Sequence, residues 1–339
     1  MILHASTILL RALDTPDMVL YERAMRKIMR FSWMSDRTET LVTPLKQYMP
    51  EEYKIPTVKA VGTFEDVLQS RCLELVDTGK HLYLQWSGGI DSTLMVISFL
   101  KSNINLDQIT IVMNRDSIKE NPKFYYTYIL PNFKLLSIEK HLSEDNDGIT
   151  IQAEHADQII SGMMLSRIDK SWTTKPATKT NLYNVCAELG FDKIAAEAFI
   201  NAMLKTGKSS PRPIDTIEDF SWWFNFNFRW LNAKEKYKPR LGYHKEFDTF
   251  YSSHDIQRWS ILNKSPDKSL YKDLIYNYTK DKDYHIYKRK WQSMGKLFFT
   301  NKPDMIVSES NSLQSFYKPF DTEFIKQYYV EDNDFCGYE

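Results

Sequence analysis

The chain has 339 residues, of which 42% are hydrophobic, enough to bury the core of two modest domains or of one elaborated domain. Lysine plus arginine and aspartate plus glutamate number 44 each, and this balance argues against binding nucleic acid mainly through bulk charge, without excluding a local basic patch. The cysteines, Cys72, Cys186 and Cys336, lie far apart, which removes support for zinc ribbons, iron–sulfur sites and thioredoxin-like chemistry. This sparse, odd set fits a reducing cytoplasm, and no apolar run approaches transmembrane length.

Residues 1–62 are predicted to be a partly helical N-terminal extension. Helical apolar spacing runs from Asp17 to Met34, and a proline-containing stretch at 43–57 is typical of a linker. Charged residues interrupt the apolar beginning of the chain and no small-residue cleavage site follows, so we expect no signal peptide.

The segment from Thr63 to Thr78 predicts a helix. Thr63 and Asp66 form a capping-box pattern, apolar residues supply one face, and Gly79 stands where a helix commonly ends. Cys72 lies on the apolar face and is therefore interpreted as a core residue rather than a nucleophile.

A short apolar run, Leu82 to Trp86, predicts a strand, and a turn with the pattern Ser-Gly-Gly-x-Asp-Ser follows it. A helical pattern then continues to about Lys101. The turn residues expected to hold phosphate are Ser87, Gly88, Gly89, Asp91, Ser92 and Thr93. The glycines leave the main-chain N–H groups open to a ligand, and the first N–H groups of a helix attract an anion. Asp91 fits beside an anion only if a cation lies between them, and Mg²⁺ commonly bridges carboxylates and phosphate oxygens. The spacing of a Walker A loop is absent.

Further apolar runs predict strands, at Gln108 to Met113, Phe133 to Ile138 and Gly148 to Gln152, with a short helix at Pro122 to Leu130. Strands that alternate with helices and carry continuous apolar runs indicate an α/β fold with a parallel sheet. We therefore expect an α/β core over residues 63–170, with ligands beyond the carboxyl ends of its strands.

Residues 171–339 are predicted to be mainly helical and to complete the active site. The expected helices are Asn181 to Leu189, Asp192 to Lys205, Thr216 to Tyr237, His254 to Asn263 and Lys268 to Thr279. The aromatic stretch 220–230 favours core or interface over a base-stacking platform, and its alternation of Phe and Asn is also compatible with a strand.

A second motif follows the last predicted strand, where Glu154 and Asp157 straddle a strand-to-helix turn. If this strand lies near the first, both acids face the phosphate turn. Asp157 then supplies a second carboxylate to the metal beside Asp91, and Glu154 acts as a base or orients an amine. The alternative is a plain helix start, where acids are favoured by the helix dipole.

A third motif is a run of cations, Lys288 to Lys290, in an otherwise neutral chain. The functional interpretation places one lysine of this run over the α-phosphate of a bound nucleotide, where it stabilises negative charge as the reaction proceeds. The alternative is a solvated surface segment.

The first motif resembles the PP-loop of the ATP pyrophosphatases, which grip pyrophosphate and cleave ATP between the α and β phosphates. This resemblance implies that the core over residues 63–170 binds ATP. Together the three motifs resemble the synthetase domain of asparagine synthetases and β-lactam synthetases, over roughly Thr63 to Gly295. Ser87 to Ser92 match the family's S-G-G-x-D-S loop, and Glu154 and Asp157 match the acids of its G-E-G-x-D-E segment. Ser161-Gly162 match the small pair that follows, and Lys288 and Lys290 match the family's R-x-K segment, with Lys for Arg.

The chain departs from the family pattern at several positions. Ala153 and His155 replace two glycines of the second motif, Gln158 replaces an acid, and Ser253 replaces an aspartate in the segment 250–256. The role of His155 stays open between a ligand contact and a cap. Position 2 is isoleucine rather than a glutaminase cysteine, so the resemblance implies nitrogen from ammonia, from a substrate amine or from a separate donor protein.

The resemblance implies a cytoplasmic, AMP-forming amide ligase that uses ATP and Mg²⁺ on a small carboxylate and an amine, with no membrane partner. A second hypothesis is a tRNA-modifying enzyme, because His155 to Gln158 also resembles the H-x-x-D-D-Q segment of tRNA lysidine synthetases. A third is an inactive ATP-binding relative, favoured by the altered second motif.

Overall fold

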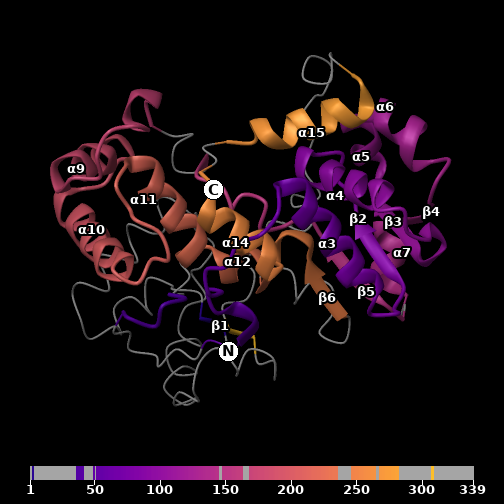
Figure 1. The fold of residues 1–339 in the computed structure, drawn as a ribbon, viewed down its shortest axis with the longest axis horizontal. Helices are drawn as coiled ribbons and strands as arrows, with labels where there is room; N and C mark the ends of the chain where they lie inside the picture. The colour runs from indigo at the N-terminus through magenta and orange to yellow at the C-terminus, as the bar shows by residue number, and fades with distance from the viewer. Residues whose placement is uncertain are drawn as a thin grey trace, which may run out of the picture. The chain divides into compact units, whose positions relative to one another are not determined.

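The computed structural model describes residues 2–3, 36–41, 49, 51–144, 147–162, 168–235, 246–264, 267–281 and 307–308 (Figure 1). The chain divides into two compact units. The first comprises residues 1–57, 160–232 and 301–339, and the second comprises 58–159 and 233–300. The helix predicted for residues 17–34 and the basic residues Lys288 and Lys290 lie outside the described residues.

The second unit is built on a five-stranded parallel sheet, so the predicted α/β fold is confirmed at that level. Its strands are β2 (Leu82–Gln85), β3 (Ile109–Met113), β4 (Lys134–Ser137), β5 (Ile149–Gln152) and β6 (Glu246–Thr249). Their order across the sheet is β4-β3-β2-β5-β6, and every neighbouring pair is parallel. Leu82 is aligned with Ile109 on one side and with Ile149 on the other. Four of these strands match the predicted apolar runs, whereas β6 was not predicted.

Helices surround this sheet. They are α3 (Phe64–Val76), α4 (Ile90–Lys101), α5 (Arg115–Glu120), α6 (Pro122–Phe124), α7 (Ile138–Ser143), α14 (His254–Leu262) and α15 (Ser269–Thr279). A π-helical segment, Tyr125–Ile129, continues α6. The predicted capping box is present at α3: the Thr63 hydroxyl accepts from the Asp66 N–H at 3.2 Å, and the Asp66 carboxylate accepts from the Thr63 N–H at 2.8 Å.

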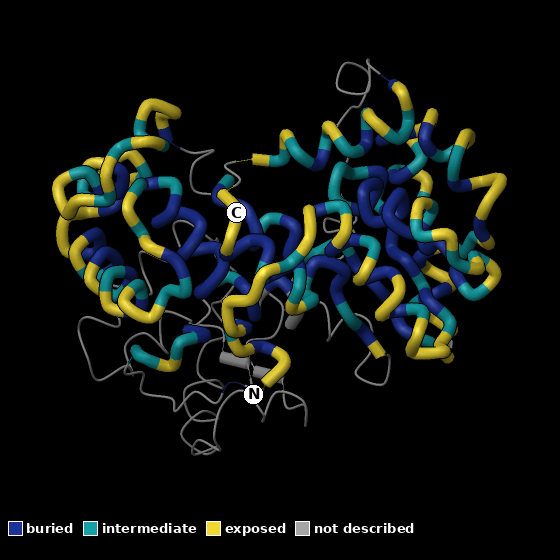
Figure 2. The backbone as a smooth tube through the Cα atoms, in the orientation of Figure 1, coloured by how far each residue is buried: buried dark blue, intermediate teal, exposed yellow. Residues whose placement is uncertain are grey.

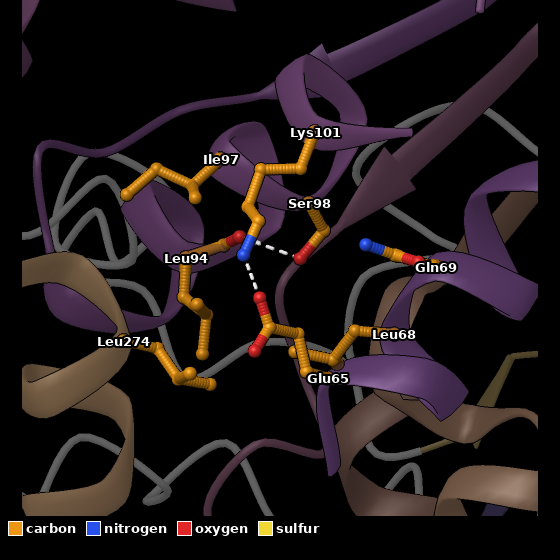
Figure 3. Close-up of a pocket in the computed structure, with 8 residues that line it drawn as sticks. All are labelled: Glu65, Leu68, Gln69, Leu94, Ile97, Ser98, Lys101 and Leu274. Carbon is orange, nitrogen blue, oxygen red and sulfur yellow. Dashed lines mark hydrogen bonds and ion pairs between the residues drawn. The ribbon is translucent and has the colours of Figure 1, made fainter. Parts of the chain in front are cut away.

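The core of this unit lies between the sheet and its helices. Every residue of β3 and β5 is buried, as the continuous apolar runs predicted for a parallel sheet covered on both faces. Figure 2 shows the buried strands inside and exposed residues on the outer helices. Cys72 is fully buried on α3, so its predicted core position is confirmed.

The strand order creates a switch point beside β2. After β2 the chain adds β3 and β4 on one side, and then returns to add β5 and β6 on the other. The connections leaving β2 and β5 therefore diverge at the carboxyl ends of two adjacent strands, where parallel α/β sheets commonly bind ligands. The Ser87 turn and the Glu154 turn follow these two ends, so the condition on which the second motif depended, that its strand lies beside the first, is met.

The first unit is mainly helical. Its described helices are α9 (Lys179–Glu188), α10 (Lys193–Gly207), α11 (Ile217–Trp223) and the start of α12 (Trp230–Glu235), and a two-residue strand, β1 (Ile2–Leu3), pairs antiparallel with β7 (Val307–Ser308). Short 3₁₀ helices occur in the described parts of the chain at Glu51–Tyr53, Leu106–Gln108, Lys170–Trp172 and Phe250–Ser252. Among the described residues, no helix is both long enough and apolar enough to cross a bilayer.

The aromatic stretch 220–230 is helical, and its alternative as a strand is wrong. Phe224–Phe228 form a π-helical turn, and each of these five residues is buried. Asn225 donates to the Ile160 carbonyl at 3.0 Å, and Asn227 donates to the Asp36 carboxylate at 2.9 Å. The asparagines alternate with phenylalanines because each one hydrogen-bonds inside the core, and this stretch is core, as predicted.

Candidate active site

The turn between β2 and α4 depends on glycine at position 88. Gly88 has φ 77°, and a Cβ there would lie 2.4 Å from the main-chain oxygen of Ser117. Both the left-handed backbone and the close approach exclude a side chain. Trp86, just before the turn, donates its main-chain N–H to the Val112 carbonyl at 2.9 Å, so the turn begins directly at the sheet edge.

Serine hydroxyls hold this turn in shape. Ser92 Oγ accepts from the Ser87 N–H at 3.1 Å and lies 3.0 Å from Ser87 Oγ, which accepts from the Gly89 N–H at 3.3 Å. Helix α4 starts from Gly89, whose position provides no side-chain cap, so its first N–H groups suit an anion. Thr93, also predicted to hold phosphate, is fully buried, and its hydroxyl accepts a hydrogen bond from the Trp86 indole N–H at 3.2 Å.

The second turn, after β5, has an unusual backbone at His155. This residue has φ 71°, which a residue other than glycine rarely adopts, and it stands where the resembled family has a glycine. The imidazole is fully buried, and its Nδ1 lies 2.7 Å from the Thr249 hydroxyl on β6. The His155 carbonyl accepts from the Gln158 N–H at 2.9 Å. His155 therefore shapes the turn from inside the core, and this burial argues against a ligand contact.

Lys268 joins the two predicted metal ligands. Its Nζ lies 2.5 Å from Asp91 Oδ2 and 2.8 Å from Asp157 Oδ1. The three side chains are 23%, 26% and 47% exposed, so the cluster is partly shielded while staying open to solvent. The two carboxylates come from the Ser87 turn and the Glu154 turn, which the sequence placed at the same sheet edge.

Two buried tyrosines hydrogen-bond to the main chain of these turns. Tyr251 donates to the Asp91 carbonyl at 2.9 Å, and Tyr271 donates to the Ala156 carbonyl at 3.0 Å. Their rings stack with centroids 5.8 Å apart and planes 4° apart. Because each hydroxyl bonds the main chain of one turn, the stacked pair fixes the spacing between the turns that carry Asp91 and Asp157.

Burial and the charges of Lys268, Asp157 and Glu154 set the pKa of Asp91. Burial raises the pKa of Asp91 to about 6; Lys268 opposes this shift, while the charges of Asp157 and Glu154 add to it. For Lys268, burial lowers the pKa, but the attraction of Asp91 and Asp157 outweighs it and raises the pKa above its usual value. The effect on Asp91 also places the charge of Glu154 within range of the cluster.

The two aspartates form a donor set that fits Mg²⁺ when phosphate oxygens and water supply its other ligands. The described residues contain no group of three or more His, Cys, Asp or Glu side chains arranged to hold a metal. Mg²⁺ is commonly bound through one or two carboxylates plus phosphate oxygens and water, which two aspartates satisfy. Asp91 Oδ1 is buried and has no hydrogen-bond partner in the described part of the chain, whereas Asp91 Oδ2 is paired with Lys268.

The structure brings most of the predicted site residues together and adds one that the sequence analysis missed. The Ser87–Ser92 turn, Glu154 and Asp157 gather at one sheet edge, whereas the predicted α-phosphate residues, Lys288 and Lys290, fall outside the described residues. Lys268 was not predicted to be a site residue. The available signal was its position as the N-cap of α15, where the helix dipole disfavours a cation unless acids compensate it.

Ser253 explains one departure from the family pattern. Its hydroxyl accepts from the Ile256 N–H at 3.3 Å and caps α14, a role that serine and aspartate share.

Comparisons of the chain with protein families, with curated proteins and with solved structures found no match.

Proposed function

We propose that this protein is an ATP-dependent, AMP-forming ligase that joins a carboxylate to ammonia or an amine on a PP-loop core. The observation that carries the proposal is the pairing of two turns at the switch point of the sheet. One is an uncapped Gly-Gly helix start and the other is an acidic turn, and Lys268 links an aspartate from each, Asp91 and Asp157. The sequence resemblance to asparagine synthetase-like enzymes supplies the reaction class.

In this proposal the Ser87–Ser92 turn binds the β and γ phosphates. The free N–H groups at the start of α4 donate to phosphate oxygens, and Gly88 lets the main chain approach them. Asp91 and Asp157 would hold Mg²⁺, which neutralises charge on the departing pyrophosphate when it is bound. Tyr251 and Tyr271 keep the two carboxylates at the required spacing through their bonds to the turns.

The proposed reaction has two steps. A substrate carboxylate oxygen attacks the α-phosphorus, a new P–O bond forms, and the bond to the bridging oxygen breaks, so pyrophosphate leaves with the electron pair. The amine nitrogen then attacks the acyl carbon and a C–N bond forms. The bond between the acyl carbon and the AMP oxygen breaks, AMP leaves with the electron pair, and the nitrogen loses a proton. Glu154 is the proposed acceptor of that proton, because it follows Gln152 at the end of β5 and its charge reaches Asp91. Lys290, backed by Lys288, is proposed to stabilise charge at the α-phosphate.

Pyrophosphate release from MgATP tests this proposal. The full chain is assayed with aspartate plus ammonia, with a panel of other amino acids and amines, and with bulk tRNA, with Asp157→Ala as the inactive control. Release with an acid and an amine, lost in a folded Asp157→Ala protein, is the expected result. Release only with tRNA would replace the proposal with the RNA-modifying hypothesis, and normal release by Asp157→Ala would refute the metal assignment. ATP binding without pyrophosphate release in the presence of any of these substrates would favour the hypothesis of an inactive relative.

A further inference from the structure

Lys268 occupies the position where a cation is expected between the two aspartates. Its ammonium lies 2.5 Å from Asp91 Oδ2 and 2.8 Å from Asp157 Oδ1, distances at which a charged donor bonds carboxylates directly. Lys268 is the cation paired with Asp91 in the described chain. Because the carboxylates come from different turns, the ammonium neutralises charge that would otherwise push the turns apart.

The fold holds this lysine in place. Lys268 is the N-cap of α15, a location that the helix dipole makes unfavourable for a positive charge. The helix is fixed to the acidic turn by the bond from Tyr271 to the Ala156 carbonyl and packs against α4. The ammonium is thus delivered to the two carboxylates by an anchored helix rather than by a freely moving surface chain.

We propose that Lys268 is a tethered cation that occupies the divalent-cation site in the nucleotide-free protein. Its ammonium must leave Asp91 and Asp157 before a divalent ion can bind them, so the ion competes with a built-in counter-charge. The consequence is that the site takes a metal poorly by itself and takes it well when phosphates arrive, since they attract both the metal and the released ammonium. This inference rests on the proposed function for the identity of the metal site.

Binding of Mn²⁺, a paramagnetic probe that favours the same oxygen ligands, tests the proposal on the full chain without nucleotide. Lys268→Met removes the competing charge and is expected to bind Mn²⁺ at least about tenfold more tightly than the parent protein, a factor equivalent to about 1.4 kcal/mol. Lys272→Met, which removes one charge a turn further along the same helix, is the matched control and is expected to leave Mn²⁺ affinity unchanged. The combination Asp91→Asn with Lys268→Met is expected to lose the gain. Equal affinity in the parent and Lys268→Met, or an equal gain in Lys272→Met, would overturn the proposal.

A second variant guards against failure of Lys268→Met to fold. Lys268→Gln keeps an N–H donor for the carboxylates but carries no charge, and the same gain in Mn²⁺ affinity is expected from it. An unchanged affinity in folded Lys268→Gln would also refute the tethered cation. The outcome is separable from that of the proposed function. Pyrophosphate release that depends on Asp157 without the Mn²⁺ effect would reject only the role of Lys268, and the Mn²⁺ effect without release would reject only the ligase.

Discussion

Replacing Gly88 with alanine should destabilise the protein more than the same change at Gly79. Both glycines have positive φ, 77° and 69°, and an L-residue in that region costs roughly 1–2 kcal/mol. Alanine recovers about 0.4–1 kcal/mol by restricting the unfolded chain, so the backbone effect alone lowers the unfolding free energy by about 1 kcal/mol. At Gly79 no atom lies within 4 Å of the added Cβ, and this is the whole expected effect.

At Gly88 the added Cβ also meets the Ser117 carbonyl oxygen at 2.4 Å and the Glu120 Cβ at 2.8 Å. Ser117 lies in α5, and its carbonyl accepts from the Asn121 N–H at 3.3 Å, so it moves only if the helix moves. Overpacking of this kind costs roughly 1–3 kcal/mol, which brings the expected loss at Gly88 to about 2–4 kcal/mol.

Urea unfolding followed by circular dichroism measures both effects, provided that the dependence on urea keeps the same slope. Gly79→Ala is the control for left-handed backbone strain without crowding. Equal losses at the two positions would refute the assigned contact between the Ser87 turn and α5, and no loss at Gly88 would refute the turn geometry itself.

Three further predictions follow from the described contacts. Cys72 and Cys186 are buried, and burial raises the pKa of each thiol to about 12, so neither should react with iodoacetamide until the chain is unfolded, as mass spectrometry of the labelled protein would show. Because the pKa of Asp91 is raised to about 6, the folded state binds a proton more readily than the unfolded chain does. The unfolding free energy should therefore fall as pH rises from about 4 to about 6. Asp91→Asn should remove this part of the pH dependence, and an unchanged pH dependence in the variant would count against the raised pKa. Tyr271→Phe should cost about 1 kcal/mol of unfolding free energy through the lost bond to the Ala156 carbonyl, whereas Tyr126→Phe, at a side chain 64% exposed, should cost nothing measurable.

Much of the sheet could be predicted because its strands are continuous apolar runs between turn signals. β6 could not, since Glu246–Thr249 contains a single apolar residue, Phe247, in a four-residue strand at the edge of the sheet. β6 is a strand because it pairs with β5, which lies far from it in the sequence, and no local sequence pattern reports that pairing.

The candidate site shows the same division between local and long-range information. The Ser87 turn and the acids at 154 and 157 were predictable, because each follows a strand and the carboxyl ends of parallel strands meet at one edge. Lys268 is 177 residues from Asp91 in the sequence, and only the packing of α15 brings the two together. The π-helical turn at Phe224–Phe228 was ambiguous for a different reason, because a segment buried on every side does not show the periodicity that separates helix from strand.

The bond cleaved in ATP is the most direct test of the proposed ligase. Phosphorus NMR of MgATP incubated with the acid and amine panel distinguishes cleavage after the α-phosphate from cleavage after the β-phosphate. The proposal predicts equal amounts of AMP and pyrophosphate that depend on both co-substrates and disappear in folded Asp91→Ala. Formation of ADP and phosphate, or undiminished AMP formation by Asp91→Ala, would contradict it.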